Sequence, residues 1–177
     1  MIEILVALVI TLIGLFGLLG FNLRTFQAES ESYQRTQALV LVDDMAQRIR
    51  ANRAGIASYV APAASGVGTG AVDTNCPAAA GAARDVCQWG NLLRGAAESV
   101  GGSNVGAMAD ARGCIFVTTP AAGAAGPSTA SVVVVWRGVN ATATVATAPC
   151  VPTGYSLTDG LMRYTATIVR LGDLDGT

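Results

Sequence analysis

Four cysteines carry the clearest reactive chemistry in this chain. Cys76, Cys87, Cys114 and Cys150 stand at wide spacings, and their number is even. An even set of widely spaced cysteines predicts two disulfides and an oxidising compartment. A zinc site is the rival interpretation, but no pair has the short C-x-x-C spacing and the chain holds no histidine to complete a ligand set. We therefore predict disulfides and no metal.

Three pairings of four cysteines exist, and the sequence favours one of them. Pairing Cys76 with Cys87 closes a short loop, and pairing Cys114 with Cys150 ties strand to strand. By the loop-entropy estimate each bridge contributes about 3 kcal/mol to stability. The other two connectivities stay open at this level.

Catalytic groups are scarce. All eleven basic residues are arginine, and histidine and lysine are both absent. Without histidine the chain lacks the commonest general base and metal ligand, and without lysine it lacks Schiff-base chemistry. The neighbouring carboxylates Asp43 and Asp44 point to different sides of a predicted helix, so we interpret them as solvated surface. We expect no enzyme activity, no cofactor and no small-molecule substrate.

The element that sets where the protein resides is the apolar run from Ile4 to Leu23. At a helical rise of about 1.5 Å per residue it spans roughly 30 Å, the thickness of the hydrocarbon core of a bilayer. Gly14, Gly17 and Gly20 interrupt the large side chains, so another helix can approach closely or this helix can bend. The run predicts a membrane-length helix.

Glu3 flanks this run and needs an explanation of its own. A carboxylate at the end of a membrane helix either lies in the interface and reaches water or pairs with a group from another molecule, such as an amine from an adjacent helix. The residue type alone leaves both interpretations open.

The helical pattern continues from Arg24 to about Arg53 without proline. Its apolar residues recur at spacings of three and four, which predicts one buried face. These residues are Ala38, Leu41, Val42, Met45 and Ile49. One helix of this length, apolar in its first half and amphipathic in its second, must be supported by two different environments.

These two stretches carry a resemblance. The opening MIEILVALVITLIGLFGLLG resembles the N-terminal segment of type IV pilins and pseudopilins, and the continuation through Gln37 to VDDM and RIRANR is similar to minor pilins of the PilV type. In that family a glutamate closely follows the peptidase cut, and Glu3 is the matching position. Only Met1 and Ile2 precede it, so we expect the basic leader, the cleavage-site glycine and the N-methylated first residue to lie outside this sequence.

The resemblance implies the role of Glu3 and the partners of the chain. In this family the matching glutamate neutralises the N-terminal amine of an adjacent subunit. The expected partners are other major and minor pilins, the inner membrane before assembly, and the pilus assembly machinery.

Beyond the helix, the sequence predicts an α+β fold. We divide the chain into residues 1–23 (membrane anchor and filament core), 24–54 (amphipathic half of the helix), 55–113 (connecting region with a short helix) and 114–177 (antiparallel sheet). The short helix is expected over residues 85–100, with Asp85 as its N-cap. Trp89 is its expected core anchor.

Four β-rich runs predict an antiparallel sheet of about four strands: residues 113–119, 131–138, 141–147 and 162–171. The nearly continuous apolar sequence from Val132 to Trp136 fits a central strand. In the last run Tyr164, Ala166 and Ile168 alternate with polar residues, which predicts a half-buried strand. The inward face needs a cover, and the apolar face of the long helix supplies one.

We interpret the chain as a minor pilin of a type IV pilus with a priming or tip role. A type II secretion pseudopilin has the same anchor and stays open as an alternative, as does an adhesive or DNA-binding tip module. The net charge of −1 gives no bias towards nucleic acid, and the arginines are too scattered to predict a basic stripe. No nucleic-acid partner is therefore expected.

Orientation rests on two opposed signals. Arg24 follows the apolar run, which by the positive-inside rule places the rest of the chain in the cytoplasm. The cysteines favour an oxidising compartment, and a basic leader of the kind found in the family would reverse the charge balance. We expect an inner-membrane protein with a periplasmic C-terminal part that later joins a filament at the cell surface.

Overall fold

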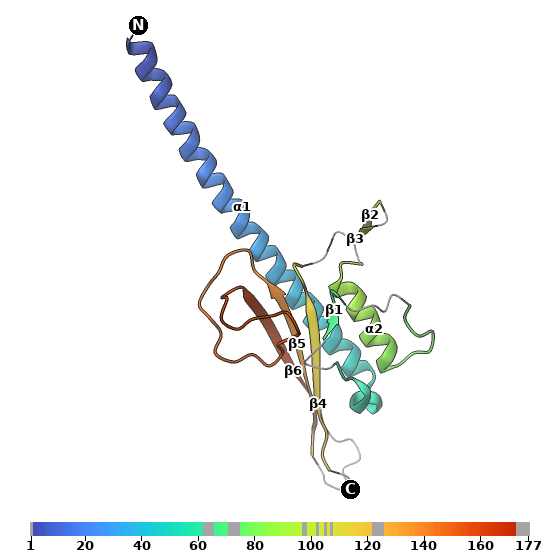
Figure 1. The fold of residues 1–177 in the computed structure, drawn as a ribbon. Coiled ribbons are helices and arrows are strands. Elements are labelled where there is room, and N and C mark those ends of the chain that lie inside the picture. The colour runs from blue at the N-terminus through green and yellow to red at the C-terminus, as the bar shows by residue number, and fades with distance from the viewer. Residues whose placement is uncertain are drawn as a thin grey trace. The chain divides into compact units, whose positions relative to one another are not determined.

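The computed structural model describes residues 2–61, 66–70, 75–96, 99–101, 103–104, 106, 108–121 and 126–172. The chain divides into two compact units, residues 1–35 and residues 36–177. Its elements, drawn in Figure 1, are α1 (Ile2–Ala51), η1 (Arg53–Ser58), β1 (Val67–Gly68), α2 (Ala82–Leu93), β2 (Ser99–Val100), β3 (Ser103–Asn104), β4 (Arg112–Thr118), β5 (Ser128–Arg137) and β6 (Met162–Leu171).

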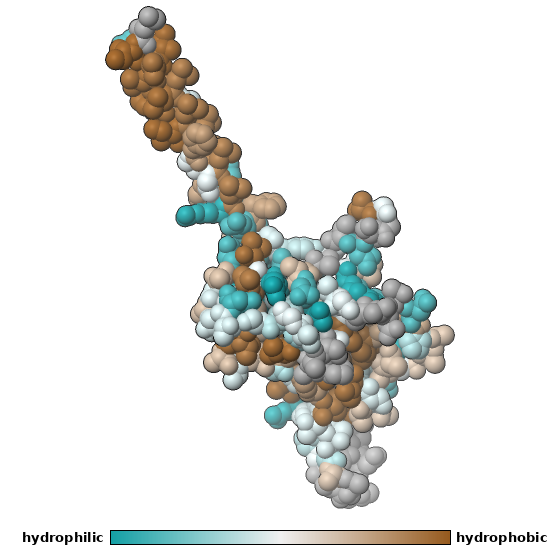
Figure 2. All heavy atoms as spheres, in the orientation of Figure 1, coloured by the Kyte–Doolittle hydropathy of each residue, from teal (hydrophilic) through white to brown (hydrophobic). Residues whose placement is uncertain are grey.

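Helix α1 is continuous over 50 residues, as the unbroken apolar and amphipathic patterns predict. In the first unit its large apolar side chains are exposed, and Figure 2 shows them on its visible surface. In the second unit the expected face is buried, with Met45 and Ile49 fully inaccessible to solvent. The buried residues of this helix are Ala38, Leu41, Val42, Met45, Ala46 and Ile49.

The main sheet has four strands in the order β1-β4-β5-β6, and every neighbouring pair is antiparallel. Strand β5 lies between β4 and β6, and Val132, Val133, Val134 and Val135 are all fully buried. The prediction of a central strand from this apolar run is confirmed. The α+β fold class is confirmed as well, with α1 and an antiparallel sheet as its main parts.

Two apolar clusters cover the two faces of the sheet. On one face Val132, Val134 and Trp136 of β5 join the buried residues of α1 and α2. On the other face Val133 and Val135 pack with residues of the 138–161 segment that joins β5 to β6. Figure 1 shows α2 and this β5–β6 loop on opposite sides of the sheet. The sequence of β5 is continuously apolar because both faces of the strand are buried.

The fourth strand differs from the prediction. Residues 141–147 form no strand; they belong to the β5–β6 loop, where Ala141 to Thr144 are exposed. Their small alternating Ala and Thr side chains offer little apolar area to bury, so strand propensity alone does not hold them in the sheet. The fourth strand is instead β1, in which Val67 and Gly68 pair with Gly113 and Arg112.

In β6 the apolar side chains that alternate with polar ones were expected to face inward, but two of them are exposed. Tyr164 and Ile168 are 41% and 61% exposed, whereas Val169 and Leu171 are buried in the cluster that contains α1. The alternation is present, but the helix covers the side that carries Val169 and Leu171. On the opposite side the cluster lined by the β5–β6 loop includes Met162 of β6 and no residue beyond it.

Helix α2 begins before the predicted start and ends before the predicted end. Gly81 is its N-cap, so the prediction of Asp85 as N-cap is wrong. Asp85 lies in the first turn, where the positive end of the helix dipole favours a carboxylate. Its side chain is then free to bond outside the helix.

Candidate functional site

The first candidate site is the exposed apolar part of α1. The helix is long and apolar enough to cross a membrane, and the stretch that meets this criterion has no buried residue. A Cβ atom added at Gly14, Gly17 or Gly20 would meet no other atom within 4 Å. This surface has the length, composition and freedom from charge that lipid or other apolar helices require.

Glu3 lies in the first turn of α1, and its side chain is exposed. The helix dipole favours a carboxylate at this end. In this unit the helix carries no other acidic residue before Glu29. The geometry therefore presents one carboxylate at the N-terminal end of a long apolar surface, available to a group from another molecule.

The four cysteines lie in the second unit, in two disulfides. Cys76 and Cys87 are joined with a Cα–Cα distance of 5.4 Å, and Cys114 and Cys150 with a distance of 6.1 Å. The first bridge fastens the segment before α2 to the helix itself. The second fastens the β5–β6 loop to β4, and both of its cysteines are fully buried. Among the described residues no three His, Cys, Asp or Glu side chains gather as metal ligands.

Trp89 attaches α2 to α1. Its indole Nε1 donates a hydrogen bond of 2.8 Å to the backbone carbonyl of Leu41, and the side chain is fully buried. The ring lies over Gly113 of β4, where an added Cβ would come within 2.2 Å of it. Gly113 therefore makes room for the indole, and one side chain holds together α1, α2 and the sheet.

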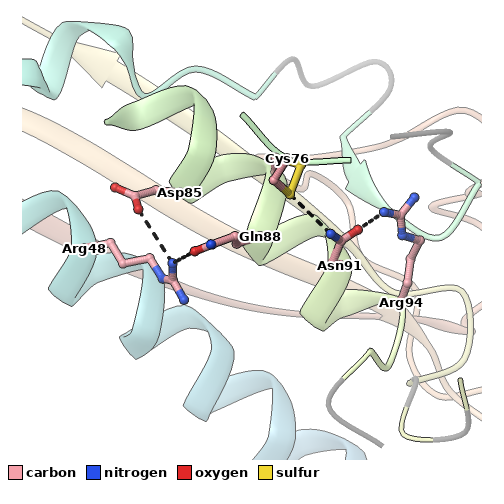
Figure 3. The surroundings of a disulfide bond; sticks show 7 residues. Arg48, Cys76, Asp85, Gln88, Asn91 and Arg94 are labelled. Carbon is pink, nitrogen blue, oxygen red and sulfur yellow. Dashed lines mark hydrogen bonds and ion pairs between the residues drawn. A yellow bond between two sulfur atoms is a disulfide. The ribbon is translucent and has the colours of Figure 1, made fainter. Parts of the chain in front are cut away.

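A polar network joins the same two helices nearer their ends (Figure 3). Arg48 of α1 donates a hydrogen bond of 2.8 Å to Gln88 of α2 and lies 3.6 Å from the carboxylate of Asp85. It also pairs with Asp44 at 2.9 Å. Asp44 is thus half-buried and paired, which corrects its interpretation as solvated surface, whereas Asp43 is exposed.

Tyr59 completes this network from the segment after η1. Its hydroxyl donates a hydrogen bond of 2.5 Å to Asp85 and accepts one of 3.2 Å from Asn52, while its side chain is fully buried. Burial, and then the bond to Asp85, raise the pKa of Tyr59 to about 12. The neutral phenol is therefore built into the contact between α1 and α2.

This shift predicts a pH dependence. Since the pKa is higher in the folded state than its ordinary 10.0, the stabilisation is fully present below pH 10 and is lost as the pH rises through 12. The free energy of unfolding should fall by about 3 kcal/mol more in the native protein than in a Tyr59→Phe variant. Denaturant titrations of both proteins from pH 8 to 12 test this. Equal pH dependences would contradict it, and Tyr155, whose pKa burial also raises, is common to both proteins.

The structure separates the predicted site residues into two groups: Glu3 lies in the first unit, and the four cysteines lie in the second. Sequence reasoning missed Tyr59 and the contacts of Arg48 with Asp85 and Gln88, because these contacts link distant segments. The one available signal was a lone tyrosine within a run of small residues, since a large aromatic side chain there needs somewhere to pack.

The fold and the site together define a class. A long helix, apolar and exposed in its first part and amphipathic in its second, with an antiparallel sheet behind the amphipathic part, is consistent with a pilin fold. Residues 20–92 match the Tt1218-like family, described as type IV pilin Tt1218. No curated protein and no solved structure matches the chain. The family match supports a type IV pilin and a structural role in a pilus.

Proposed function

We propose that this chain is a structural subunit of a type IV pilus. The apolar half of α1 holds it in the inner membrane before assembly and packs against the helices of other subunits afterwards. One observation carries this proposal: the membrane-length part of α1 is uncharged, and none of its residues is buried within the subunit. Lipid and sister helices are two environments that cover such a surface in turn. The family match over residues 20–92 supports the same class.

Glu3 sets the register of that packing in this proposal. Its exposed carboxylate neutralises the N-terminal amine of an adjacent subunit inside the helical bundle. A carboxylate left unpaired among apolar helices is costly, so subunits that dock in a wrong register are disfavoured. The position of Glu3 in the first turn supports this role, because the helix carries no basic residue before Arg24 that could neutralise it.

The finer assignment is a minor subunit that primes assembly or occupies the tip. Its support is the likeness of the VDDM and RIRANR stretches of α1 to PilV-type minor pilins. The two disulfides support a periplasmic second unit, since such bonds persist in oxidising compartments. The partners are then other pilins and the assembly machinery.

A Glu3→Val substitution tests the pairing role. Removing the carboxylate leaves the amine of the neighbour without its partner, which costs about 3–5 kcal/mol for a buried pair. We expect a large loss of the chain from sheared filaments and fewer filaments per cell. Glu29→Val is the matched control, since Glu29 is exposed farther along the same helix.

Normal incorporation of the Glu3→Val chain, with an unchanged number of pili, would refute the pairing role. The same cell fractions test the choice of filament. Recovery of the native chain in a type II secretion fibre, and not in pili, would assign it to the pseudopilins.

A further inference from the structure

The two disulfides differ in how far solvent can reach them. Cys114 and Cys150 are fully buried, whereas Cys76 and Cys87 are each half-buried. A thiol exchanges with a disulfide only when its thiolate can reach one of the two sulfur atoms, so access decides which bridge reacts. Of the two bridges in the folded protein, Cys76–Cys87 meets this requirement.

A cleft gives access to one cysteine of this bridge. Cys87 lines a cleft of about 160 Å³ between β1 and α2, together with Val67 and Val86. One water molecule needs roughly 15 Å³, so the cleft has room for a side chain of another molecule. Arg94 is the charged residue among the described residues that line it. An approaching thiolate therefore meets apolar walls and one favourable charge.

The other cysteine of the bridge accepts a hydrogen bond (Figure 3). The side-chain amide of Asn91 donates from Nδ2 to Sγ of Cys76 at 3.3 Å. Arg94 in turn donates to Oδ1 of Asn91, which polarises the amide and strengthens it as a donor. A donor at this position stabilises a thiolate more than it stabilises a neutral sulfur. Cys76 is therefore the better leaving group of the two.

From the cleft at Cys87 and the donor at Cys76 we infer that this bridge is a thiol-exchange site for a dithiol protein. The thiolate of the incoming cysteine forms a bond to Sγ of Cys87. The Cys76–Cys87 bond breaks, and its electron pair goes to Cys76. Asn91 stabilises the Cys76 thiolate, which then takes a proton from water.

The second thiol of the dithiol protein completes the exchange. It loses its proton and attacks the mixed disulfide at the sulfur of the first cysteine, so that Cys87 leaves as a thiolate and is protonated. Two electrons have then passed from the dithiol to the bridge. The dithiol protein ends as a disulfide, and Cys76 and Cys87 end as thiols.

The fold can undergo this reaction without opening its core. Asn75 and residues 77–80 are exposed, so breaking the bridge releases a surface segment before α2. Helix α2 stays attached to α1 through the buried Trp89, and the Cys114–Cys150 bridge stays closed. Exchange at Cys76–Cys87 thus changes the surface beside α2 and leaves the buried contacts in place.

Limited reduction of the full chain in detergent micelles tests which bridge reacts. The protein is treated with dithiothreitol, its thiols are alkylated, and the labelled peptides are mapped by mass spectrometry. We expect Cys76 and Cys87 to be labelled at least about tenfold faster than Cys114 and Cys150, which react only after unfolding. Thioredoxin with its second active-site cysteine replaced by serine then traps the attack, and the mixed disulfide is expected on Cys87.

Matched variants test the two features that carry the inference. Asn91→Leu removes the donor at similar side-chain size and should slow reduction about tenfold, the effect of one hydrogen bond to a charged group. Gln88→Leu is the control, because this half-buried amide of the same helix bonds to Arg48 and not to the sulfur. Its rate should be unchanged. Ala83→Trp, at an exposed position that lines the cleft, should block trapping by thioredoxin.

Four results would overturn the inference. Labelling of Cys114 and Cys150 in step with the other pair would show that the bridge opens by unfolding, and each variant carries this internal check. A mixed disulfide on Cys76 would reverse the assigned leaving group. Equal rates for Asn91→Leu and Gln88→Leu would remove the role of the donor, and unchanged trapping in Ala83→Trp would remove the role of the cleft.

Discussion

Replacing Trp89 by alanine is expected to lower the free energy of unfolding by about 3–5 kcal/mol. The side chain is fully buried, so its removal leaves a cavity between α1, α2 and β4. The hydrogen bond from its Nε1 to the Leu41 carbonyl is lost at the same time. Denaturant unfolding of the full chain in detergent micelles, followed by circular dichroism, measures the change. A loss below about 1 kcal/mol, the size expected at an exposed site, would contradict the anchoring role.

Gly113 provides the matched partner for this experiment. A Cβ at this position would lie 2.2 Å from the Trp89 ring and 2.8 Å from Leu93, so Gly113→Ala should cost about 1–3 kcal/mol in the native background. In the Trp89→Ala background the new methyl group enters vacated space, and the cost should vanish or reverse. Additive costs would show that the two residues do not share the space that the structure assigns to them.

Removing the Cys114–Cys150 bridge is expected to destabilise the second unit by about 4 kcal/mol, against about 3 kcal/mol for Cys76–Cys87. The difference follows from loop length, because the two bridges span sequence separations of 36 and 11 residues. The longer loop restricts the unfolded chain more. The variants are Cys114→Ala with Cys150→Ala, and Cys76→Ala with Cys87→Ala.

Loss of the Cys114–Cys150 bridge should also have a local signature that the other pair lacks. Tyr155 belongs to the β5–β6 loop, and its ring packs against the cluster that contains Cys114 and Cys150. Hydrogen exchange of this loop should therefore rise in the first double variant only. An unchanged loop, or a larger destabilisation from the Cys76 and Cys87 variants, would contradict this account.

The sequence predicted the parts of the fold that repeat. The spacing of Leu41, Met45 and Ile49 predicts a buried helix face, and four consecutive valines predict a strand buried on both sides; the structure has both. Local periodicity is sufficient here because residues one helical turn apart, or two residues apart in a strand, lie in the same environment.

The same reasoning failed where a contact between segments distant in sequence determines the structure. Strand β1 has two residues and so no period, and it exists because β4 offers an edge to pair with. The 141–147 segment has strand propensity but joins no strand of the sheet. For β6 the alternation was visible, but which side the helix would cover was not.

The residues of the candidate site also fall into those that the sequence identifies and those that it does not. Glu3 and the cysteines are recognisable from residue type and position alone. The contact of Trp89 with Gly113 and the bond of Tyr59 to Asp85 depend on how segments distant in sequence meet, and no pattern within either segment encodes them.

The β5–β6 loop is held to the sheet covalently at one point, and this has a use in engineering. Cys150 fixes the loop over β4, while Ala141 to Thr144 are exposed and belong to neither apolar cluster. Thr142 is hydrogen-bonded to Gly160 through its backbone N–H, so an insertion beyond it leaves this contact in place, and exposed loop positions tolerate added sequence. An epitope tag inserted after Thr144 would thus label the subunit for microscopy and leave α1 unmodified.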